Sequence, residues 1–167
     1  KRELYFPEMK SAKIIVSKDE LELVFNKEWL YLKRSIIQKV FDYLGMLHEE
    51  FNRIARQKSL LLPYLPIDRM GKISRGENLE GLPYLIMDYP ALFTKEKIIA
   101  VRTLFWWGNF FSISLHLSGL RASREQILPW IAYFKEHNFH INTSGNEWNY
   151  EFDEDGFAPI TQESHFY

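Results

Sequence analysis

The residue whose type and position are most informative is Arg102, the only charged residue in the run Ile98–Trp107. A guanidinium on the apolar side of a strand must pair with an acid or extend its charged end to water. Asp88 is the expected partner because it ends another apolar run, Leu82–Asp88, and Glu80 is the second choice. The pattern predicts either an ion pair that fixes a sheet or a guanidinium that recognises an anion at the mouth of a pocket.

A second candidate for chemistry is His116, which alternates with Ser112 and Ser114 along one strand face. Nucleophilic catalysis needs a hydroxyl, a base and an orienting group within hydrogen-bond reach. Residues two apart on a strand face are ~6.5–7 Å apart at the backbone, and the chain has no GxSxG elbow. The favoured interpretation is ordinary hydroxyls on a half-exposed strand, and a serine hydrolase site is the alternative.

The other histidines do not have the spacing of a metal site. The run His48-Glu49-Glu50 begins like a zinc-binding helix but lacks a second histidine four positions on. His137 and His140 are three apart but have no obvious third ligand, and the chain has no cysteine. Phosphate-binding and dinucleotide-binding glycine motifs are also missing from the sequence. We therefore expect neither a metal nor a cofactor.

Aromatic residues crowd the short connection Gly108-Asn109, with two tryptophans before it and two phenylalanines after it. Because neighbouring strand residues point to opposite faces, these rings either lie in a core covered on both sides or form a contact surface. Together with the polar candidates they define the expected ligand-binding set: Arg102, Asp88, His116, Trp106 and Trp107.

The two runs beside this connection, Ile98–Trp107 and Phe110–Ser118, predict a β-hairpin with a two-residue turn at Gly108-Asn109. A two-residue turn places Trp107 opposite Phe110 and therefore Arg102 opposite Leu115. In this register Arg102 and His116 lie on opposite faces of the hairpin.

Helices are expected on both sides of the strand-rich middle of the chain. Ser17 and Glu20 have the spacing of a capping box, although alternating residues 20–23 also suit a strand, as does Ala12–Val16. A long helix from Lys27 to Arg56, with Asn26 as its N-cap, has one apolar stripe of six residues: Ile37, Val40, Leu44, Leu47, Phe51 and Ile54.

A second helix is expected after Ser123, followed by a second hairpin between Phe139–Asn142 and Glu147–Phe152. The predicted fold class is therefore α+β: an antiparallel sheet with hairpins, covered by the long helix and the helix after Ser123. The length of 167 residues, with 46% hydrophobic and 26% charged residues, favours a single globular domain over residues 1–167.

The net charge of −1 disfavours nucleic acid as a partner, and no apolar run is long enough for a membrane span. The opening Lys1-Arg2-Glu3-Leu4 has no apolar signal region, which leads us to expect a soluble, cytoplasmic protein. Residues 126–167 are the exception in charge, with one basic and seven acidic residues. Because this segment is rich in aromatics, we expect it to fold back on the body of the protein, with an acidic interaction tail as the alternative.

The sequence thus predicts a non-catalytic binding or protein-interaction module whose partner is an unidentified small molecule or protein. The alternative is a small hydrolase-like enzyme that acts on an anionic small molecule through Arg102, Asp88, His116 and Arg75. A dimer could form through the long helix or through the aromatic hairpin.

Overall fold

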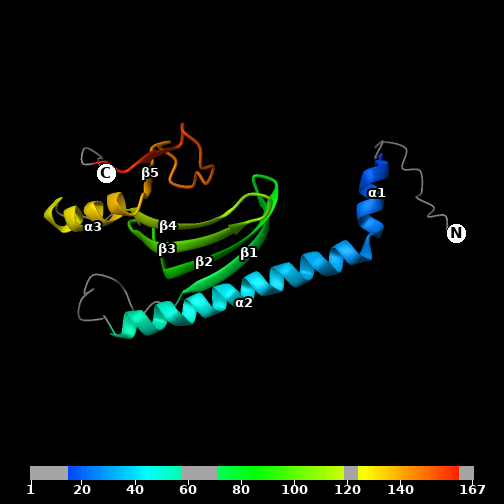
Figure 1. The fold of residues 1–167 in the computed structure, drawn as a ribbon, viewed down its shortest axis with the longest axis horizontal. Helices are drawn as coiled ribbons and strands as arrows, with labels where there is room; N and C mark the ends of the chain where they lie inside the picture. Colours follow the sequence, from blue (N-terminus) through cyan, green and yellow to red (C-terminus); the bar gives the residue numbers. More distant parts are fainter. Residues whose placement is uncertain (1–14, 58–70, 119–123, 162–167) are drawn as a thin grey trace. The chain divides into compact units, whose positions relative to one another are not determined.

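The structure, a computed structural model, describes residues 15–57, 71–118 and 124–161. Three helices and two antiparallel sheets, of four strands and two strands, give the predicted α+β class (Figure 1). The helices are α1 (Lys18–Phe25), α2 (Lys27–Gln57) and α3 (Arg124–Glu136); the strands are β1 (Lys72–Leu79), β2 (Leu82–Phe93), β3 (Ile98–Trp106), β4 (Phe111–Ser118), β5 (His140–Asn142) and β6 (Phe157–Pro159). None of these helices has a stretch long and apolar enough to cross a membrane.

The chain divides into two compact units, Lys1–Tyr43 and Leu44–Tyr167, and the expectation of a single domain stays a prediction. In the first unit, the predicted capping box and N-cap are confirmed. The hydroxyl of Ser17 accepts a hydrogen bond from the Glu20 N–H at 3.2 Å, and the Glu20 carboxylate accepts one from the Ser17 N–H at 2.6 Å. The Asn26 side chain accepts from the N–H of Trp29 at 2.9 Å and begins α2.

Because α1 includes residues 20–23, they are not a strand. The strand predicted at Ala12–Val16 lies mostly outside the described residues, and its last two residues, Ile15 and Val16, are not in a strand.

In the second unit, β1, β2, β3 and β4 follow one another across an antiparallel sheet. Glu80 and Gly81 connect β1 to β2 with φ angles of 47° and 80°, the pair of positive values that a type I′ hairpin turn requires. The predicted end of this strand at Asp88 was wrong, since β2 runs to Phe93. A register shift between Tyr89 and Leu92 accommodates Pro90, which has no N–H to donate to a neighbouring strand.

The predicted register of the β3–β4 hairpin was wrong by one residue. The N–H of Trp106 donates to the carbonyl of Phe110 at 3.0 Å, so the connection is the three residues Trp107–Asn109. Gly108 has the expected positive φ, 79°, but at the third position of a turn closed by a 3.0 Å hydrogen bond from Asn109 N–H to Trp106 O. Arg102 therefore lies opposite Ser114 rather than Leu115.

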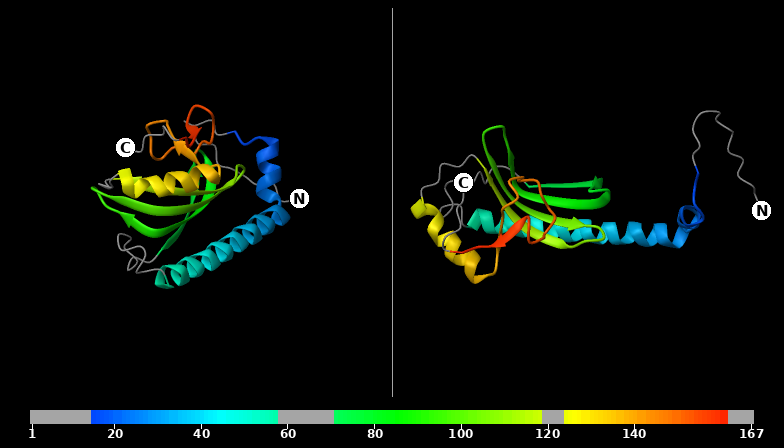
Figure 2. Two further views of the ribbon diagram at one scale, coloured as in Figure 1. Left: turned by 60° about the vertical axis from the view of Figure 1, so that its left-hand side comes forward. Right: turned by 90° about the horizontal axis from the view of Figure 1, so that it is seen from above.

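This one-residue shift exchanges the two faces of β4. The even-numbered residues around Arg102 now share a face with His116, which we call the arginine face. The odd-numbered residues, such as Tyr89, form the helix face, where Tyr89 donates a 2.9 Å hydrogen bond to Asn52 of α2 and stacks on Phe51. Figure 2 shows the sheet with the second half of α2 on one side and the chain after β5 on the other.

The core of the arginine face is a cluster of three buried residues, Ile86, Leu104 and Trp106. Tyr84 and Tyr150 pack against this cluster. Gly76 is the neighbour that makes room for Tyr84, because a Cβ at residue 76 would lie 2.5 Å from that ring. Side chains of two strands and of the chain beyond β5 therefore meet over this part of the sheet.

The second predicted hairpin was wrong in its partner strand. The strand β5 pairs with β6, and residues 147–152 begin in a turn and have no regular secondary structure after it, instead of a strand. The amide oxygens of Asn146 and Asn149 accept 3.0 Å hydrogen bonds from backbone N–H groups two residues on, and Asp153 accepts one from Gly156 at 2.6 Å. Asn and Asp side chains compete in this way with the hydrogen bonds of a sheet. We call residues 143–156 the C-terminal loop.

Candidate functional site

Arg102 and Asp88 lie directly opposite each other on β3 and β2 and form the predicted ion pair. The contact is bidentate: Nε donates to Oδ1 at 2.7 Å and Nη2 donates to Oδ2 at 2.9 Å. Arg102 is 8% exposed and Asp88 is 6% exposed. Bidentate geometry away from water makes this pair a specific link between two strands.

The third nitrogen of the guanidinium contacts the C-terminal loop. Nη1 of Arg102 donates a hydrogen bond to the phenolic oxygen of Tyr150. The rings of Phe93, Trp148 and Tyr150 lie around the guanidinium carbon, with centroids at 5.7, 5.4 and 5.7 Å. These distances are within the range of cation–π attraction. The N–H groups of the guanidinium are thus hydrogen-bonded to Asp88 and Tyr150, and aromatic rings surround its carbon atom.

Charge and burial act in opposite directions on these groups. Burial works against the charged form of Arg102, but Asp88 and Tyr150 together outweigh it and raise the pKa of the guanidinium above its ordinary value. Burial also raises the pKa of the Tyr150 phenol, although the nearby Arg102 opposes that change. Arg102 is therefore cationic and Tyr150 is a neutral phenol at neutral pH.

His116 joins this group from β4, which corrects the prediction that it faces away from Arg102. Its ring stacks on Tyr150 with centroids 6.2 Å apart and lies 5.6 Å from the ring of Trp148. Burial lowers the pKa of His116, and the charge of Arg102 lowers it further, against weaker opposite effects of Asp88 and Glu147. The imidazole is therefore neutral at neutral pH.

The two predicted tryptophans lie in different surroundings, and neither contacts the guanidinium of Arg102 in the way that Trp148 does. Trp106 is 4% exposed and belongs to the core of the arginine face, where its indole N–H donates to the carbonyl of Leu79 at 3.1 Å. Trp107 is half-buried in the turn after β3, with its ring edge-on to Phe105 at 5.6 Å. The structure thus gathers Arg102, Asp88 and His116, and places Trp107 apart from them.

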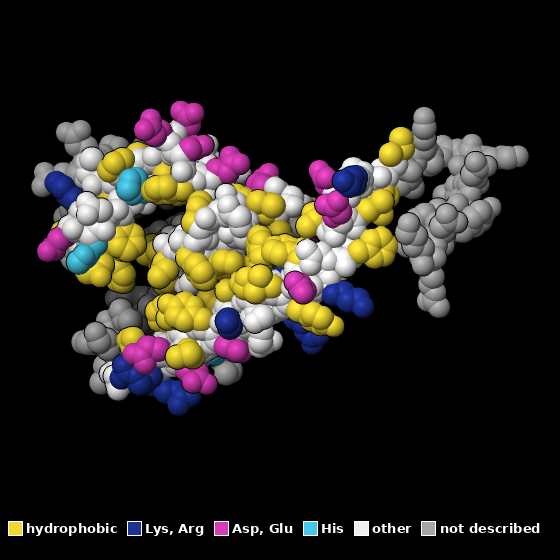
Figure 3. Space-filling model, turned by 45° about the vertical axis from the view of Figure 1, so that its right-hand side comes forward, with side chains coloured by type: hydrophobic (Ala, Val, Ile, Leu, Met, Phe, Trp, Pro, Cys, Tyr) yellow, Lys and Arg dark blue, Asp and Glu magenta, His cyan; other side chains and the backbone are white. Residues whose placement is uncertain are grey.

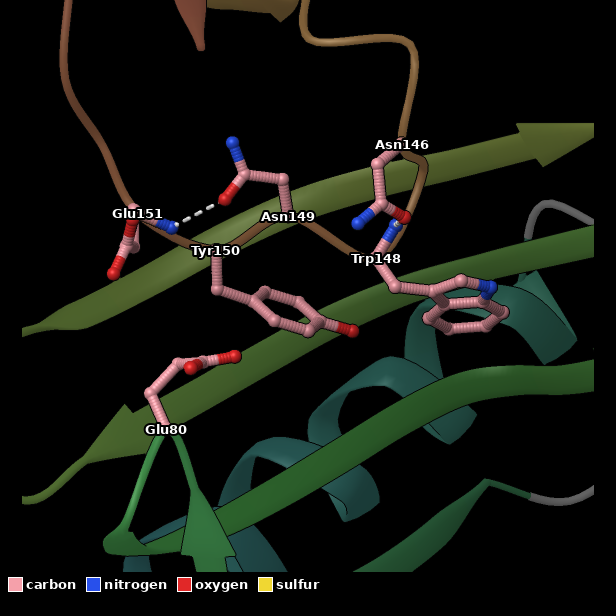
Figure 4. Close-up of a pocket in the computed structure, with 6 residues that line it drawn as sticks. All are labelled: Glu80, Asn146, Trp148, Asn149, Tyr150 and Glu151. Carbon is pink, nitrogen blue, oxygen red and sulfur yellow. Dashed lines mark hydrogen bonds between the residues drawn. The ribbon is translucent and has the colours of Figure 1, made fainter.

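A cavity of about 150 Å³ lies between the β1–β2 turn and the C-terminal loop (Figure 4). Two carboxylates, two amides and two aromatic rings line it: Glu80, Asn146, Trp148, Asn149, Tyr150 and Glu151. In Figure 4 the Glu80 carboxylate lies below the ring of Tyr150, on the side opposite the loop backbone. The cavity therefore presents hydrogen-bond acceptors and ring surfaces, a combination suited to a cation or a polar donor group.

Sequence reasoning missed the tyrosine and tryptophan of this loop because it assigned them to a strand. The signal that could have found them is the repeated asparagine at residues 142, 146 and 149, which is typical of consecutive turns. Glu80, named as the second choice for the Arg102 partner, instead lines the cavity beside the ion pair.

The outer side of the C-terminal loop is acidic. Figure 3 shows the acidic side chains of this part of the molecule gathered along its outer surface. Five exposed acids lie in the loop, and its sequence has no lysine or arginine: Glu147, Glu151, Asp153, Glu154 and Asp155. The segment thus folds back on the sheet through its aromatic residues while its acids face solvent.

Among the described residues, no group of three or more His, Asp or Glu side chains is arranged to hold a metal ion. Comparisons of the chain with protein-family models, curated proteins and solved structures gave no match.

Proposed function

We propose that this protein is a non-catalytic protein-interaction module that binds a basic segment of a partner at the cavity of the C-terminal loop. The observation that carries the proposal is the attachment of this loop to the buried Arg102 through Tyr150. Because the guanidinium is occupied by Asp88 and Tyr150, it supports the cavity wall and leaves ligand contact to the residues above it.

The chemistry of the cavity favours a lysine or arginine side chain as its occupant. The carboxylates of Glu80 and Glu151 can accept charge-assisted hydrogen bonds, and Trp148, which is 42% exposed, offers a ring surface. The loop that lines the cavity has five acids and no lysine or arginine, and its negative charge attracts a basic segment over a distance of about one Debye length, ~8 Å at physiological ionic strength.

The test is binding of a fluorescein-labelled oligolysine peptide, measured by anisotropy at low and high salt. We expect saturable binding that weakens with salt and that drops at least tenfold, about 1.4 kcal/mol, in the double variant Glu80→Gln/Glu151→Gln. The matched control, Glu49→Gln/Glu96→Gln, removes the same charge outside the cavity. Equal losses in the two variants would show that net charge, rather than the cavity, binds the peptide.

A hydrolase-like enzyme for an anionic small molecule is the second candidate, because Arg102, Asp88 and His116 converge on one face of the sheet. The neutral imidazole of His116 could act as a base if a substrate displaced the ring of Tyr150 that stacks on it. A screen with chromogenic phosphate and carboxylate esters tests this candidate. Turnover that disappears in His116→Gln would favour the enzyme over the binding module.

A further inference from the structure

The strand β4 forms an outer edge of the four-stranded sheet (Figure 1). Within the described part of the chain it pairs with β3 alone. The hydrogen bond from Trp106 to Phe110 fixes the alternation along the hairpin, so the even-numbered residues of β4 direct their backbone groups at β3. Residues such as Ile113 and Leu115 therefore direct their N–H and C=O groups toward the open edge.

The two edges of this sheet differ in protection against further strand pairing. The outer strand β1 has three charged residues, Lys72, Arg75 and Glu77, and an irregular register after Gly76. Charges and bulges of this kind prevent edge-to-edge pairing. By contrast β4, Phe-Ser-Ile-Ser-Leu-His-Leu-Ser, has no Lys, Arg, Asp, Glu or Pro, and its register with β3 is unbroken. The edge at β4 is thus suited to accept another strand.

The helix face of β4 is exposed and apolar. Phe111 is 53% exposed, Ile113 is 61% exposed and Leu117 is 50% exposed, all on one side of the strand. An added strand would meet backbone groups at the edge and apolar side chains on this face. A strand in which apolar and polar residues alternate, as they do in β4, would pair with these backbone groups and pack against these apolar side chains.

The sequence of β4 is itself such a strand, because its pattern is symmetric about Ser114. Phe111 and Leu117 are equidistant from it, as are Ile113 and Leu115, and as are Ser112 and His116. We propose that β4 pairs antiparallel with β4 of a second copy of this chain, about a two-fold axis at Ser114.

In this register, Ile113 of one copy lies opposite Leu115 of the other, and the two exchange backbone hydrogen bonds. Phe111 packs against Leu117 on the same apolar face, and Ser112 lies opposite His116 on the polar face. The two-fold axis repeats every contact, as an isologous interface requires. No charged residue of one β4 meets a like charge of the other, since the strand has none.

The lining of the cavity in the C-terminal loop has no residue of β4, and His116 is the interface residue that contacts the lining, at Trp148 and Tyr150. Substitutions at residues 112–114 therefore test dimerisation without changing a lining residue of the cavity. The second copy also joins two sheets into one continuous sheet, so that each edge at β4 is covered.

The test uses the absence of cysteine from the natural chain. Ser114 lies opposite its own copy at a non-hydrogen-bonded pair, where the Cα atoms are ~4.5 Å apart, and disulfides form at ~4.4–6.8 Å. We expect Ser114→Cys to form a disulfide-linked dimer under mild oxidation. Ser112→Cys is the matched control, because its two copies are offset by four residues, ~13 Å along the strands, and cannot be bridged.

Light scattering after size exclusion supplies the second measurement. We expect the natural protein to have twice the 20.0 kDa chain mass and Ile113→Lys to have the mass of one chain. Met46→Lys, which places the same charge at an exposed apolar residue of α2, should stay dimeric. A one-chain mass for the natural protein would overturn the proposal. A dimeric Ile113→Lys variant, or equal cross-linking of Ser112→Cys and Ser114→Cys, would also overturn it.

Discussion

Tyr150 and Arg102 are 48 residues apart in the chain, yet the phenolic oxygen of one accepts a hydrogen bond from Nη1 of the other. This contact joins a loop without regular secondary structure to the centre of the sheet. It also brings the rings of Trp148 and Tyr150 against a cation that two strands already hold. The buried guanidinium of Arg102 is therefore one of the contacts that position the cavity, together with the rings of Phe93 and His116.

Replacing Tyr150 with Phe should loosen the C-terminal loop. Hydrogen bonds to charged groups contribute about 1.5–3 kcal/mol, so we expect a loss of this size in the free energy of unfolding. Amide hydrogen exchange should become faster in residues 143–156 while β2 and β3 keep their protection. The control is Tyr31→Phe, because Tyr31 is 70% exposed. Unchanged exchange in the loop would show that its ring contacts, and not this hydrogen bond, hold it.

The ion pair should show strong coupling in a double-mutant cycle. Arg102→Met leaves the buried carboxylate of Asp88 without its partner, and we expect a loss of about 3–5 kcal/mol in stability. Asp88→Leu should cost a similar amount, because it leaves the buried guanidinium of Arg102 without its carboxylate. The double variant should cost much less than the sum of the two, as measured by urea unfolding. Additive losses would mean that the two side chains act independently.

The turn after β3 should tolerate Asn but reject Val at residue 108. Gly108 has φ of 79°, a conformation that Asn adopts with little strain and a β-branched residue adopts poorly. We expect Gly108→Val to lose about 1–3 kcal/mol in the free energy of unfolding, with a smaller loss for Gly108→Asn. Thermal unfolding of the two variants, side by side, provides the measurement. Equal stability would contradict the positive φ.

The free energy of unfolding should decrease as the pH is lowered below 6.5, because of His116. Its pKa is lowered in the folded state from 6.5, so the unfolded state binds the proton more tightly. This contribution to stability is fully present above pH 6.5 and is lost as the pH falls through 6.5 toward the lowered value. One proton sets an upper limit of ~1.4 kcal/mol per pH unit on the slope in this window, and His116→Gln should reduce the slope. An unchanged slope would assign the pH dependence to other groups.

The ion pair and the long helix could be predicted from the sequence because each depends on a strong local rule. A lone arginine in an apolar strand requires an acid, and Asp88 ends the neighbouring apolar run. The apolar stripe and the cap at Asn26 likewise specify α2 with little dependence on the rest of the chain.

The face of His116 could not be predicted, because it depends on whether the turn at Gly108 has two residues or three. Both lengths suit a glycine with positive φ, and a difference of one residue reverses every side chain of β4. The hydrogen bond between Tyr150 and Arg102 could not be predicted either, since only the folded sheet brings the two residues together.

The contacts of the C-terminal loop with three strands imply an order of assembly. Its rings lie against Phe93 of β2, Arg102 of β3 and His116 of β4, so its docking surface does not exist until these strands have paired. Closing a long loop costs entropy before its contacts form, which delays such distant contacts further. In refolding, the hairpins should acquire protection first and the loop last. The chain therefore completes its cavity only after the sheet is complete.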